Sequence, residues 1–389
     1  MKTIINLGMH PFADTFISQE QFGMSEPVYP LECVLDSDSG EIKLKYETLD
    51  DDRYNLYSYS YTSSNSKVSR SHWNNYAEEV LKNISNKEKI LEIGSNDGYL
   101  TEQFLKQQID ARGVDPSKKM TTIAKDRGVQ TYNTLFNSKS VKTIINEFGL
   151  FDIWIANNVF NHANNPEDFI KSVNSVLKED GTFVFELPYW FCTIRDKRFD
   201  QIYHEHVTYF TAKYSYNLLK KHGLSITKIK VVDYHGGSLR VYSKKTKNIN
   251  KIKELQAMIE QEENYGLFKK ETYEKFMRDL KRDRNLFMQK IYQIKSRDIP
   301  IIGIGAAAKA NTFLNFYNID NTILDYITDS SEHKKGKFTP LTRIPIVEDE
   351  ILANFDEVYV LILSWNISNV LIEKIKKINN KIKFISLRS

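Results

Sequence analysis

The chain has 389 residues, a formal net charge of +4 at pH 7 and two cysteines, and 41% of its residues are hydrophobic. This length predicts two or three domains. The nearly balanced charge argues against a large basic surface, so nucleic acid is not an expected partner. No apolar run reaches the length of a membrane span and no signal-peptide pattern opens the chain, so we expect a cytoplasmic protein with no membrane partner.

The N-terminal region, residues 1–70, is predicted to be a small β-rich lobe. Residues 1–50 alternate short apolar runs with turns, of which the Asp-, Ser- and Gly-rich segment 36–40 is the clearest. Residues 54–66 follow and are rich in hydroxyl groups. Such a segment is either a solvated loop or the wall or lid of a cleft, and its four tyrosines within eight positions favour the cleft.

A glycine-rich stretch at residues 89–104 organises the rest of the chain. Its apolar start ends near Glu92, breaks at Gly94-Ser-Asn-Asp-Gly98 and passes into helical spacing, which predicts a strand, a tight loop and a helix. A phosphate-binding loop requires Gly-Lys-Ser/Thr, and this stretch has no such motif. An acid beside a glycine loop instead suits a ligand with a cationic amino group and a ribose, such as S-adenosylmethionine (SAM). The alternative is an ordinary strand–helix turn of any α/β protein.

Residues 71–245 are predicted to form a SAM-binding domain with a parallel, doubly wound Rossmann-like sheet, because strand and helix patterns alternate from residue 89 to residue 186. Asp115 ends the second strand about twenty residues past the glycine loop, where an acid can bind ribose hydroxyls. Ligands of such sheets lie at the carboxyl ends of the strands. The predicted SAM pocket therefore draws on three strand ends and contains Glu92, Gly94, Asn96, Asp115 and Asn157.

Two further motifs place polar residues in the same domain. Residues 199–211 contain His204, Glu205 and His206. An acid–base role is favoured for this cluster, because imidazole titrates near neutral pH and a carboxylate can orient it. A polar loop whose histidines cap a helix is the alternative, and a metal site is disfavoured because no third ligand stands at a typical spacing. The second motif, His235-Gly236-Gly237, indicates close backbone approach or a bulge.

The last part of the chain divides into a helical linker, residues 246–298, and a second Rossmann-like domain, residues 299–389. The linker is charged and keeps rough helical spacing. The second domain begins with a strand and a Gly303-x-Gly305 turn that lacks the last glycine of a dinucleotide fingerprint. Asp329 ends a later strand, and a cationic loop at residues 333–337 follows it. That loop is either solvated surface or a site for the phosphates of a nucleotide-bearing substrate.

Four motifs together resemble those of the SAM-dependent sugar C-methyltransferases, bacterial enzymes that act on nucleotide-linked deoxysugars. The motifs are Glu92-Ile-Gly-Ser-Asn-Asp-Gly98, Tyr203-His-Glu-His206 with Tyr209-Phe210, His235-Gly-Gly-Ser-Leu-Arg240 and Gly305-Ala-Ala-Ala-Lys-Ala-Asn311. The last is followed, as in the family, by Asp329, His333-Lys-Lys-Gly336 and Ile344-Pro-Ile346. The resemblance covers nearly the whole chain and implies a small zinc lobe, a SAM-binding domain and a C-terminal Rossmann-like domain, in that order.

The resemblance also implies residue roles. His206 is the expected general base, with Tyr203 and Glu205 beside it and Tyr59 or Tyr61 closing the site. The expected substrate is a nucleoside-diphosphate-linked sugar, and the residues predicted to bind it are Tyr189, His235, Gly236, Lys309, Asn311, Asp329 and Lys334.

Two features depart from the family pattern. The family usually carries two Cys-x-x-Cys pairs in its first lobe, where this chain has only Cys33, so no metal is expected. The family also usually reads Pro-His where this chain has Pro188-Tyr189.

We therefore expect methyl transfer from SAM to a carbon next to the ketone of a nucleoside-diphosphate-linked deoxysugar. One alternative is O- or N-methylation of the same class of sugar, which Tyr189 makes credible. The other is a non-catalytic nucleotide-sugar-binding protein that uses the C-terminal glycine turn. The nucleotide base, the sugar and the oligomeric state do not follow from the sequence.

Overall fold

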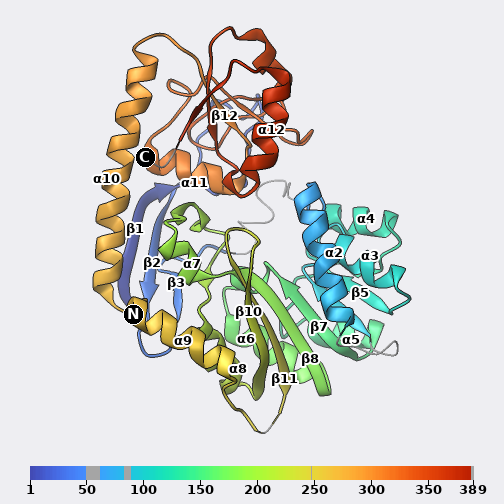
Figure 1. Cartoon of the computed structure of the whole chain (residues 1–389). Helices are drawn as coiled ribbons and strands as arrows, with labels where there is room; N and C mark the ends of the chain where they lie inside the picture. Colours follow the sequence, from blue (N-terminus) through green and yellow to red (C-terminus); the bar gives the residue numbers. More distant parts are fainter. Residues whose placement is uncertain (50–61, 83–88, 247, 387–389) are drawn as a thin grey trace.

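The computed structural model describes residues 1–49, 62–82, 89–246 and 248–386, and these residues contain three β-sheets (Figure 1). A four-stranded sheet lies in the N-terminal lobe, a seven-stranded sheet in the middle domain and a five-stranded sheet in the C-terminal domain. The predicted α/β class, with a β-rich lobe and two Rossmann-like sheets, is confirmed. The exact domain boundaries stay predictions.

The sheet of the N-terminal lobe contains one strand from far along the chain. β1 (Lys2–His10), β2 (Tyr29–Leu35) and β3 (Ile42–Leu44) pair antiparallel, and β9 (Thr208–Tyr209) joins β3 at the outer edge. A strand of two residues leaves no period in the sequence, so β9 was not predicted. It attaches the loop that contains His206 to the N-terminal lobe.

The middle domain is built on the strand order β10-β11-β8-β7-β4-β5-β6, in which the strands from β8 to β6 run parallel and β11 is antiparallel to both of its neighbours. Its strands are β4 (Ile90–Ile93), β5 (Ala111–Val114), β6 (Thr131–Tyr132), β7 (Phe151–Asn157), β8 (Leu177–Pro188), β10 (Leu224–Val232) and β11 (Ser238–Lys245). Its helices are α2 (Lys67–Leu81), α3 (Tyr99–Lys106), α4 (Lys118–Asp126), α5 (Val141–Phe148), α6 (Pro166–Val176), α7 (Trp190–Arg195) and α8 (Ala212–Lys221), with short 3-10 turns η1 (Phe160–His162) and η2 (Phe199–Gln201).

Local sequence explains where these elements begin. Ser66, Ser117 and Thr211 each accept a backbone N–H bond at the start of α2, α4 and α8, which satisfies a donor that the helix leaves unpaired. All four residues of β4 are buried, as expected for a parallel strand covered by helices on both faces. Polar residues stand at the carboxyl ends of these strands, and that edge of the sheet is where the candidate site lies.

The predicted linker contains two helices, α9 (Lys253–Tyr265) and α10 (Lys270–Lys295). The C-terminal sheet follows with the all-parallel order β14-β13-β12-β15-β16. Its elements are β12 (Ile301–Ile304), α11 (Ala308–Tyr317), β13 (Tyr326–Thr328), β14 (Ile346–Val347), η3 (Asp349–Asn354), β15 (Tyr359–Ile362), η4 (Trp365–Ile367), α12 (Ser368–Ile378) and β16 (Lys383–Ile385). Figure 1 shows α10 running beside β1 and reaching the C-terminal domain.

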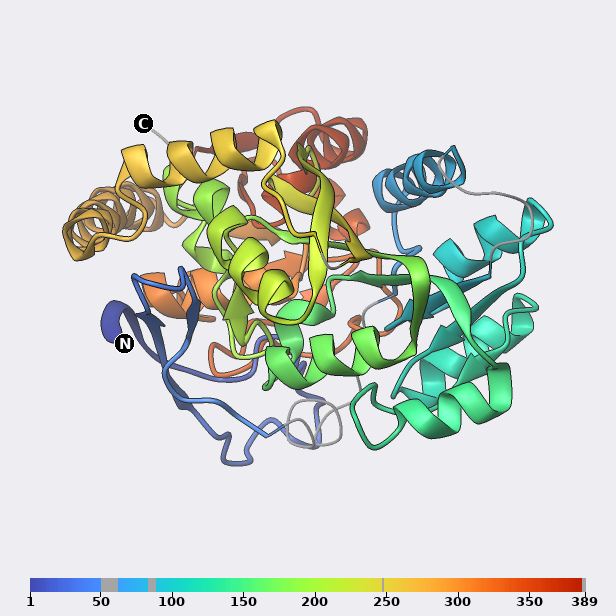
Figure 2. The ribbon, with the colours of Figure 1, turned by 90° about the horizontal axis from the view of Figure 1, so that it is seen from below.

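The loop at 199–211 packs against both the N-terminal lobe and the C-terminal domain. Phe199 contacts three aromatic rings of α11, namely Phe313, Phe316 and Tyr317. The Asn311 side chain donates to the Ala13 carbonyl at 2.5 Å, which ties α11 to the N-terminal lobe. One cluster of buried apolar side chains extends through all three parts of the chain. Seen from below, α10 and the helices α2 to α5 lie at opposite ends of the molecule (Figure 2).

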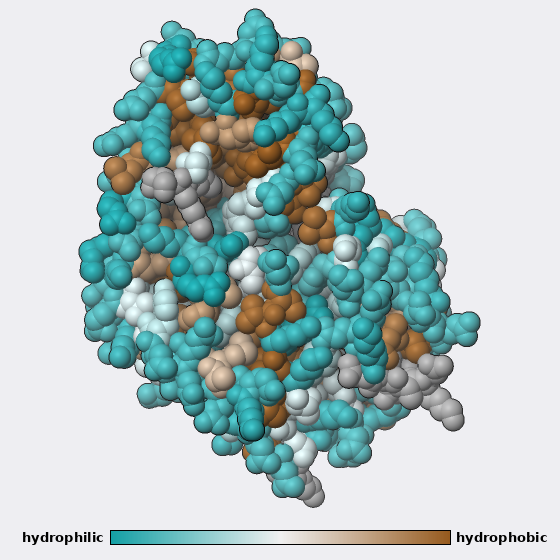
Figure 3. Space-filling model, in the orientation of Figure 1, coloured by the Kyte–Doolittle hydropathy of each residue, from teal (hydrophilic) through white to brown (hydrophobic). Residues whose placement is uncertain are grey.

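Hydrophilic side chains cover most of the face shown in Figure 3, and hydrophobic ones gather over the C-terminal domain at the top of the view. Among the described residues, no helix combines the length and the apolar character that crossing a membrane requires.

Candidate active site

The predicted glycine loop lies between β4 and α3, and Asp115 at the end of β5 holds it in place. Asp115 Oδ2 accepts a hydrogen bond from the Asn96 backbone N–H at 2.8 Å, and Oδ1 accepts one from the Ser117 N–H at 2.9 Å. A Cβ atom on Gly94 would lie 2.1 Å from Val159 Cγ2, so only glycine fits there. Burial raises the pKa of Asp115 to about 6. The acid predicted to bind ribose therefore lies against the loop predicted to bind SAM.

Glu92 lies at the end of β4, but its carboxyl group turns toward α3. It accepts a hydrogen bond from Thr101 Oγ1 at 2.5 Å and is buried. Burial raises its pKa to about 8. These contacts are internal to the domain, so the contact between Glu92 and SAM stays a prediction.

Several polar atoms at this edge of the sheet are buried without a hydrogen-bond partner among the described residues. They are Ser95 Oγ, both amide atoms of Asn157 and the Tyr76 hydroxyl, although the Asn157 amide lies close enough to the Tyr76 hydroxyl to interact with it. A buried polar atom without a partner is costly unless a ligand or water completes it. SAM carries ribose hydroxyls, an amino group and a carboxylate, and this set of donors and acceptors fits such a ligand.

The hydroxyl-rich segment reaches the glycine loop at its described end. The Ser63 backbone N–H donates to Asn96 Oδ1 at 2.8 Å, and the hydroxyls of Ser63 and Ser64 both donate to the Asp97 carboxylate. Arg127 Nη2 donates to Ser64 Oγ at 2.9 Å and lies 3.4 Å from Asp97. These contacts favour the cleft-wall interpretation over a freely solvated loop. Tyr59 and Tyr61 lie outside the described residues.

His206 is held by hydrogen bonds on both ring nitrogens. Nδ1 lies 2.9 Å from the Gln201 carbonyl oxygen, and Nε2 lies 2.7 Å from the Tyr203 hydroxyl. A carbonyl oxygen can only accept, so Nδ1 carries the proton and Nε2 presents its lone pair to the Tyr203 O–H. Burial is the main cause that lowers the pKa of His206 to about 4, and the charge of Lys309 contributes. The ring is therefore neutral at pH 7 and can accept a proton at Nε2.

The two neighbours of His206 in the cluster have other surroundings. The His204 ring is fully buried and packs edge-on against Phe12 and Tyr29, so it is a packing residue of the lobe interface. Burial lowers its pKa to about 4. Glu205 Oε1 accepts a hydrogen bond from the Asp14 backbone N–H at 3.2 Å, which links the loop to the N-terminal lobe. The catalytic assignment of Glu205 stays a prediction.

Tyr189, predicted to bind substrate, is buried and uses its hydroxyl inside the fold. The hydroxyl donates to Glu262 Oε1 at 2.8 Å. Glu262 also accepts the backbone N–H groups of Ala212, at 2.5 Å, and Lys213, at 3.1 Å, and so completes the first turn of α8. This geometry gives Tyr189 a structural contact with α9, and its contact with substrate stays a prediction that the geometry does not support.

The C-terminal glycine turn repeats the arrangement around Asp115. Asp329 Oδ2 accepts a hydrogen bond from the Ala306 N–H at 2.7 Å, and Oδ1 accepts one from the Ser331 N–H at 2.9 Å. A Cβ atom on Gly305 would lie 2.2 Å from Ser364 Oγ. Lys334 donates to the Ala306 carbonyl at 2.6 Å. Asp329 and Lys334 thus bind their own turn, and their contacts with substrate stay predictions.

Lys309 belongs to a cation–aromatic cluster that the sequence did not indicate. Its ammonium nitrogen lies 4.5 Å from the centroid of the Trp365 ring, and the guanidinium carbon of Arg198 lies 4.0 Å from the same centroid. The Trp365 indole N–H donates to the Asp200 carboxylate. Burial lowers the pKa of Lys309 to about 8, although the charge of Asp200 opposes this shift.

The same cluster meets the predicted His235-Gly236 turn. A Cβ atom on Gly236 would lie 2.1 Å from Arg198 Nη1, so the turn approaches the guanidinium closely. Burial lowers the pKa of His235, and the charge of Lys309 adds to this shift. The charge of Lys309 thus acts on both His206 and His235, which precede it by 103 and 74 positions in the sequence.

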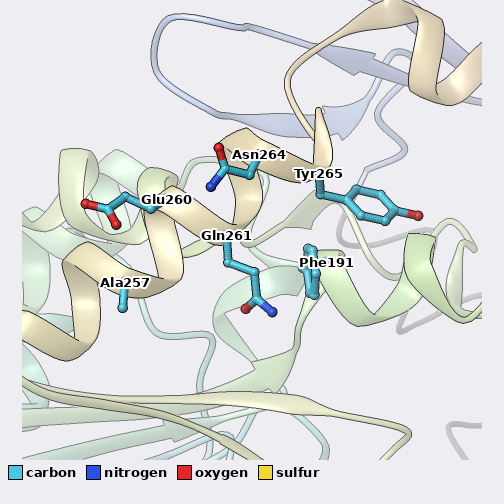
Figure 4. A pocket seen from close by; sticks show the side chains of 6 residues that line it. All are labelled: Phe191, Ala257, Glu260, Gln261, Asn264 and Tyr265. Carbon is cyan, nitrogen blue, oxygen red and sulfur yellow. The ribbon is translucent and has the colours of Figure 1, made fainter.

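Within the described part of the chain, no group of three or more His, Cys, Asp and Glu side chains has the arrangement to hold a metal ion. Cys33 and Cys192 are buried free thiols. The absence of zinc in solution stays a prediction. An open hollow of about 550 Å³ lies between α7 and α9, and Figure 4 shows its lining residues Phe191, Ala257, Glu260, Gln261, Asn264 and Tyr265. None of the predicted site residues lines it.

Two family models match consecutive parts of the chain. A methyltransferase domain matches residues 70–229, and a C-methyltransferase C-terminal domain matches residues 233–387. The chain therefore carries a methyltransferase domain followed by a C-methyltransferase C-terminal domain, which is the organisation of a methyltransferase enzyme with SAM as its cofactor. It is 26% identical over 377 residues to the C-methyltransferase NovU of Streptomyces niveus, covering 96% of this chain and 89% of that protein.

Three further similarities each cover only part of the chain. The ubiquinone biosynthesis O-methyltransferase of Pelagibacter ubique (strain HTCC1062) is 27% identical over 105 residues, covering 27% of this chain and 42% of that enzyme. Among solved structures, magnesium protoporphyrin IX methyltransferase of Synechocystis PCC 6803 with bound SAH aligns with a TM-score of 0.36 and 12% identity, covering 46% of this chain and 83% of that one. A SAM-dependent methyltransferase from Clostridium acetobutylicum ATCC 824 aligns with a TM-score of 0.36 and 16% identity, covering 46% and 92% of the two chains.

Proposed function

We propose that this enzyme transfers a methyl group from SAM to a carbon next to the ketone of a nucleoside-diphosphate-linked deoxysugar, with His206 as the general base. The observation that carries the proposal is the state of His206, whose Nδ1 is fixed as a donor to Gln201 while Nε2 keeps its lone pair for a proton. The similarity to the C-methyltransferase NovU over nearly the whole chain supports carbon as the methylated atom.

The residues predicted to bind SAM lie at the carboxyl ends of three neighbouring strands of the middle sheet. Gly94 and Asn96 form the loop at the end of β4, Asp115 stands at the end of β5, and Asn157 stands at the end of β7. We assign the ribose hydroxyls to Asp115, because its carboxylate oxygens keep lone pairs beyond the two backbone bonds they accept. The Asn157 amide provides an acceptor and a donor for the amino acid end of SAM.

The chemistry then depends on a few positioned groups. When bound, SAM supplies an activated methyl group on a sulfonium. His206 Nε2 would remove a proton from the carbon next to the ketone, and the resulting enolate carbon would form the new bond to the methyl carbon. The S–CH3 bond of SAM would break in the same step, with its electron pair left on the sulfur of the neutral thioether product. Tyr203 now donates to Nε2, and in the complex its O–H is placed to donate to the enolate oxygen instead. One proton is released per turnover, and it leaves from the imidazolium of His206.

The nucleoside diphosphate is assigned to the cleft side of the C-terminal domain, at Lys309. The Lys309 ammonium nitrogen lies 4.5 Å from the centroid of the Trp365 ring, and its charge lowers the pKa of both His206 and His235, so a phosphate bound there would act on the base electrostatically. A bound diphosphate also offsets the positive charge of Lys309. The pKa of His206 should then rise from its low value toward the working pH, which makes the ring a better base.

The test is proton exchange without methyl transfer. A panel of nucleoside-diphosphate-linked 4-keto-6-deoxyhexoses is incubated in heavy water with enzyme and the demethylated product of SAM, which fills the cofactor site but has no methyl to give. Wild type should exchange the hydrogen next to the ketone for deuterium, and His206→Asn should not. Exchange at the same rate in both proteins would exclude His206 as the base.

O- or N-methylation of the same class of sugar is the second candidate, because a neutral imidazole can equally deprotonate a hydroxyl or ammonium group. Nuclear magnetic resonance of the methylated product distinguishes the candidates, since the methyl carbon shift differs between carbon, oxygen and nitrogen attachment. A non-catalytic nucleotide-sugar-binding protein is disfavoured by the methyltransferase family of the chain.

A further inference from the structure

A second imidazole at the carboxyl edge of the middle sheet is held by a carboxylate. His72, on α2, places Nε2 2.6 Å from Glu186 Oε1, at the end of β8. Glu186 is fully buried, and its other oxygen accepts a hydrogen bond from Arg240 Nε at 2.6 Å. The His72 ring also stacks on Tyr234, with centroids 3.7 Å apart and planes inclined by 6°. Its position is therefore fixed on two sides.

This arrangement determines the tautomer of His72. A carboxylate bound to Arg240 accepts hydrogen bonds, so Nε2 carries the proton in the neutral ring and Nδ1 keeps the lone pair. Nδ1 of His72 makes no hydrogen bond to a described residue and is not among the fully buried atoms. An imidazole oriented by a carboxylate on one nitrogen, with the other open, has the arrangement of an acid–base residue.

The pair lies between the predicted cofactor and the His206 loop. Glu186 pairs in the sheet with Asn157 of β7, whose strand borders β4 and its glycine loop. On the other side, the Tyr234 ring lies 4.0 Å from the His235 ring. The His235 carbonyl in turn accepts a hydrogen bond from Gln201 Nε2 at 2.5 Å, and the Gln201 backbone carbonyl lies 2.9 Å from His206 Nδ1. The open nitrogen of His72 is thus beside the region where the methyl acceptor must meet SAM.

We propose that His72 is a substrate-binding residue of the acceptor site, in which Nδ1 accepts a hydrogen bond from a hydroxyl or amino group of the acceptor sugar and Glu186 fixes the tautomer that makes this possible. The inference rests on the proposed function, because it requires a sugar in the cleft. It involves no covalent step, since His206 takes the proton from carbon.

Among the described residues, the charged and titratable groups around His72 are few. On β8 and β11 they are Glu186 and Arg240, and on the turn after β10 they are Tyr234 and His235. On α2 itself, Glu79 binds Arg240 Nη1 at 2.6 Å and does not contact His72. Glu79 therefore belongs to the same network without contacting the imidazole, which makes Glu79→Gln a matched control for general damage to the network.

Two isosteric substitutions separate the proposed role from a purely structural one. The amide of asparagine overlays Nδ1 of histidine, and the amide of glutamine overlays Nε2. His72→Asn therefore keeps an acceptor toward the sugar and loses Glu186, whereas His72→Gln keeps the contact with Glu186 and loses the acceptor. If His72 binds the sugar, His72→Asn should retain a KM within a few-fold of wild type, while His72→Gln should raise KM about tenfold or more.

The measurement is steady-state kinetics with the nucleotide sugar that wild type methylates, together with SAM affinity and melting temperature for each variant. SAM affinity should stay unchanged in both His72 variants and in Glu79→Gln, and KM for the sugar should stay unchanged in Glu79→Gln. If His72→Gln has the wild-type KM for the sugar, or if His72→Asn has the higher KM of the two variants, His72 only anchors Glu186 and the proposal is wrong.

A measurement on wild type alone covers the case in which a variant does not fold. In ¹⁵N-histidine spectra, the Nδ1 signal of His72 should shift on adding the nucleotide sugar. An unchanged signal overturns the proposal. Failure of wild type to methylate any nucleotide sugar would instead contradict the proposed function, so the two failures are distinct.

Discussion

The Tyr203 hydroxyl lies 2.7 Å from His206 Nε2, so the nitrogen proposed as the base already receives a hydrogen bond from a tyrosine. The contact is compatible with catalysis only if the hydroxyl can exchange partners when substrate enters. Because Gln201 holds the opposite nitrogen, the ring keeps its orientation while Tyr203 turns to the substrate oxygen. Base and oxyanion donor would then act on adjacent atoms of one ligand.

His206→Asn should lower kcat by roughly a hundredfold or more, the scale for loss of a general base, with unchanged SAM affinity. The asparagine amide can still donate to Gln201, so the loop should keep its shape. Calorimetry with SAM and stopped-time assays of methyl transfer measure the two quantities. Tyr203→Phe is the companion variant, since it leaves the base intact and removes the donor. If it lowers kcat while deuterium exchange persists at the wild-type rate, the oxyanion assignment of Tyr203 is wrong.

Lys309→Gln should change the pH dependence of the reaction. The charge of Lys309 lowers the pKa of His206 in the free enzyme, so removing it should raise that pKa above its value of about 4. Because a base acts in its deprotonated form, the rising limb of the kcat/KM profile should move to higher pH.

The same variant should raise KM for the nucleotide sugar, since it also removes the proposed phosphate contact, and leave SAM affinity unchanged. Lys334→Gln is the control, because Lys334 contacts the Ala306 carbonyl and the Phe16 ring. An equal rise of KM in both variants would mean that the C-terminal domain acts through general positive charge and not through a site at Lys309.

Asp115→Asn should weaken SAM binding by a few kcal/mol at most, the scale for a hydrogen bond to a charged group. The substitution keeps one acceptor oxygen but replaces the other with a donor, which faces the backbone N–H of Asn96 or Ser117. Titration calorimetry with SAM measures the loss. Asp329→Asn disturbs the equivalent turn of the C-terminal domain and should leave SAM affinity unchanged. A loss of SAM affinity in the Asp329→Asn variant would mean that SAM binds at the C-terminal turn and that its assignment to the Asp115 turn is wrong.

The local sequence was enough to predict the strands and loops of the candidate site. Which other side chains meet there depends on contacts between residues that are far apart in the sequence. The β4–loop–α3 unit follows from the hydrophobic periodicity and the glycines of residues 89–104, so it could be predicted directly from the sequence. The pair of His72 and Glu186 joins residues 114 positions apart, and no pattern near either one indicates the other. Trp365 of η4 likewise meets Asp200 of η2, although 165 positions separate them in the sequence. The inward turn of Tyr189 depends on Glu262 of α9, an element predicted only as a linker helix.

Glu262 makes stability depend on pH in a defined direction. It is fully buried, and burial raises its pKa from 4.5 to about 7 although Tyr189, Ala212 and Lys213 donate to it. A carboxyl whose folded-state pKa is raised binds its proton more tightly when folded, so its contribution to stability is full below pH 4.5 and is lost as pH rises through 7.

Glu262→Gln imitates the protonated carboxyl group at every pH and should remove this dependence. Relative to wild type, the free energy of unfolding of the variant should therefore increase between pH 5 and pH 8, by up to ~3 kcal/mol for a shift of this size. Urea unfolding at several pH values measures the difference. Glu263→Gln alters the next residue, which faces Lys213 on the surface at 3.6 Å, and should give a difference that does not change with pH. If the free energies of unfolding of Glu262→Gln and wild type differ by the same amount at every pH in this range, Glu262 stays ionised in the folded protein and its three hydrogen-bond donors stabilise the charge.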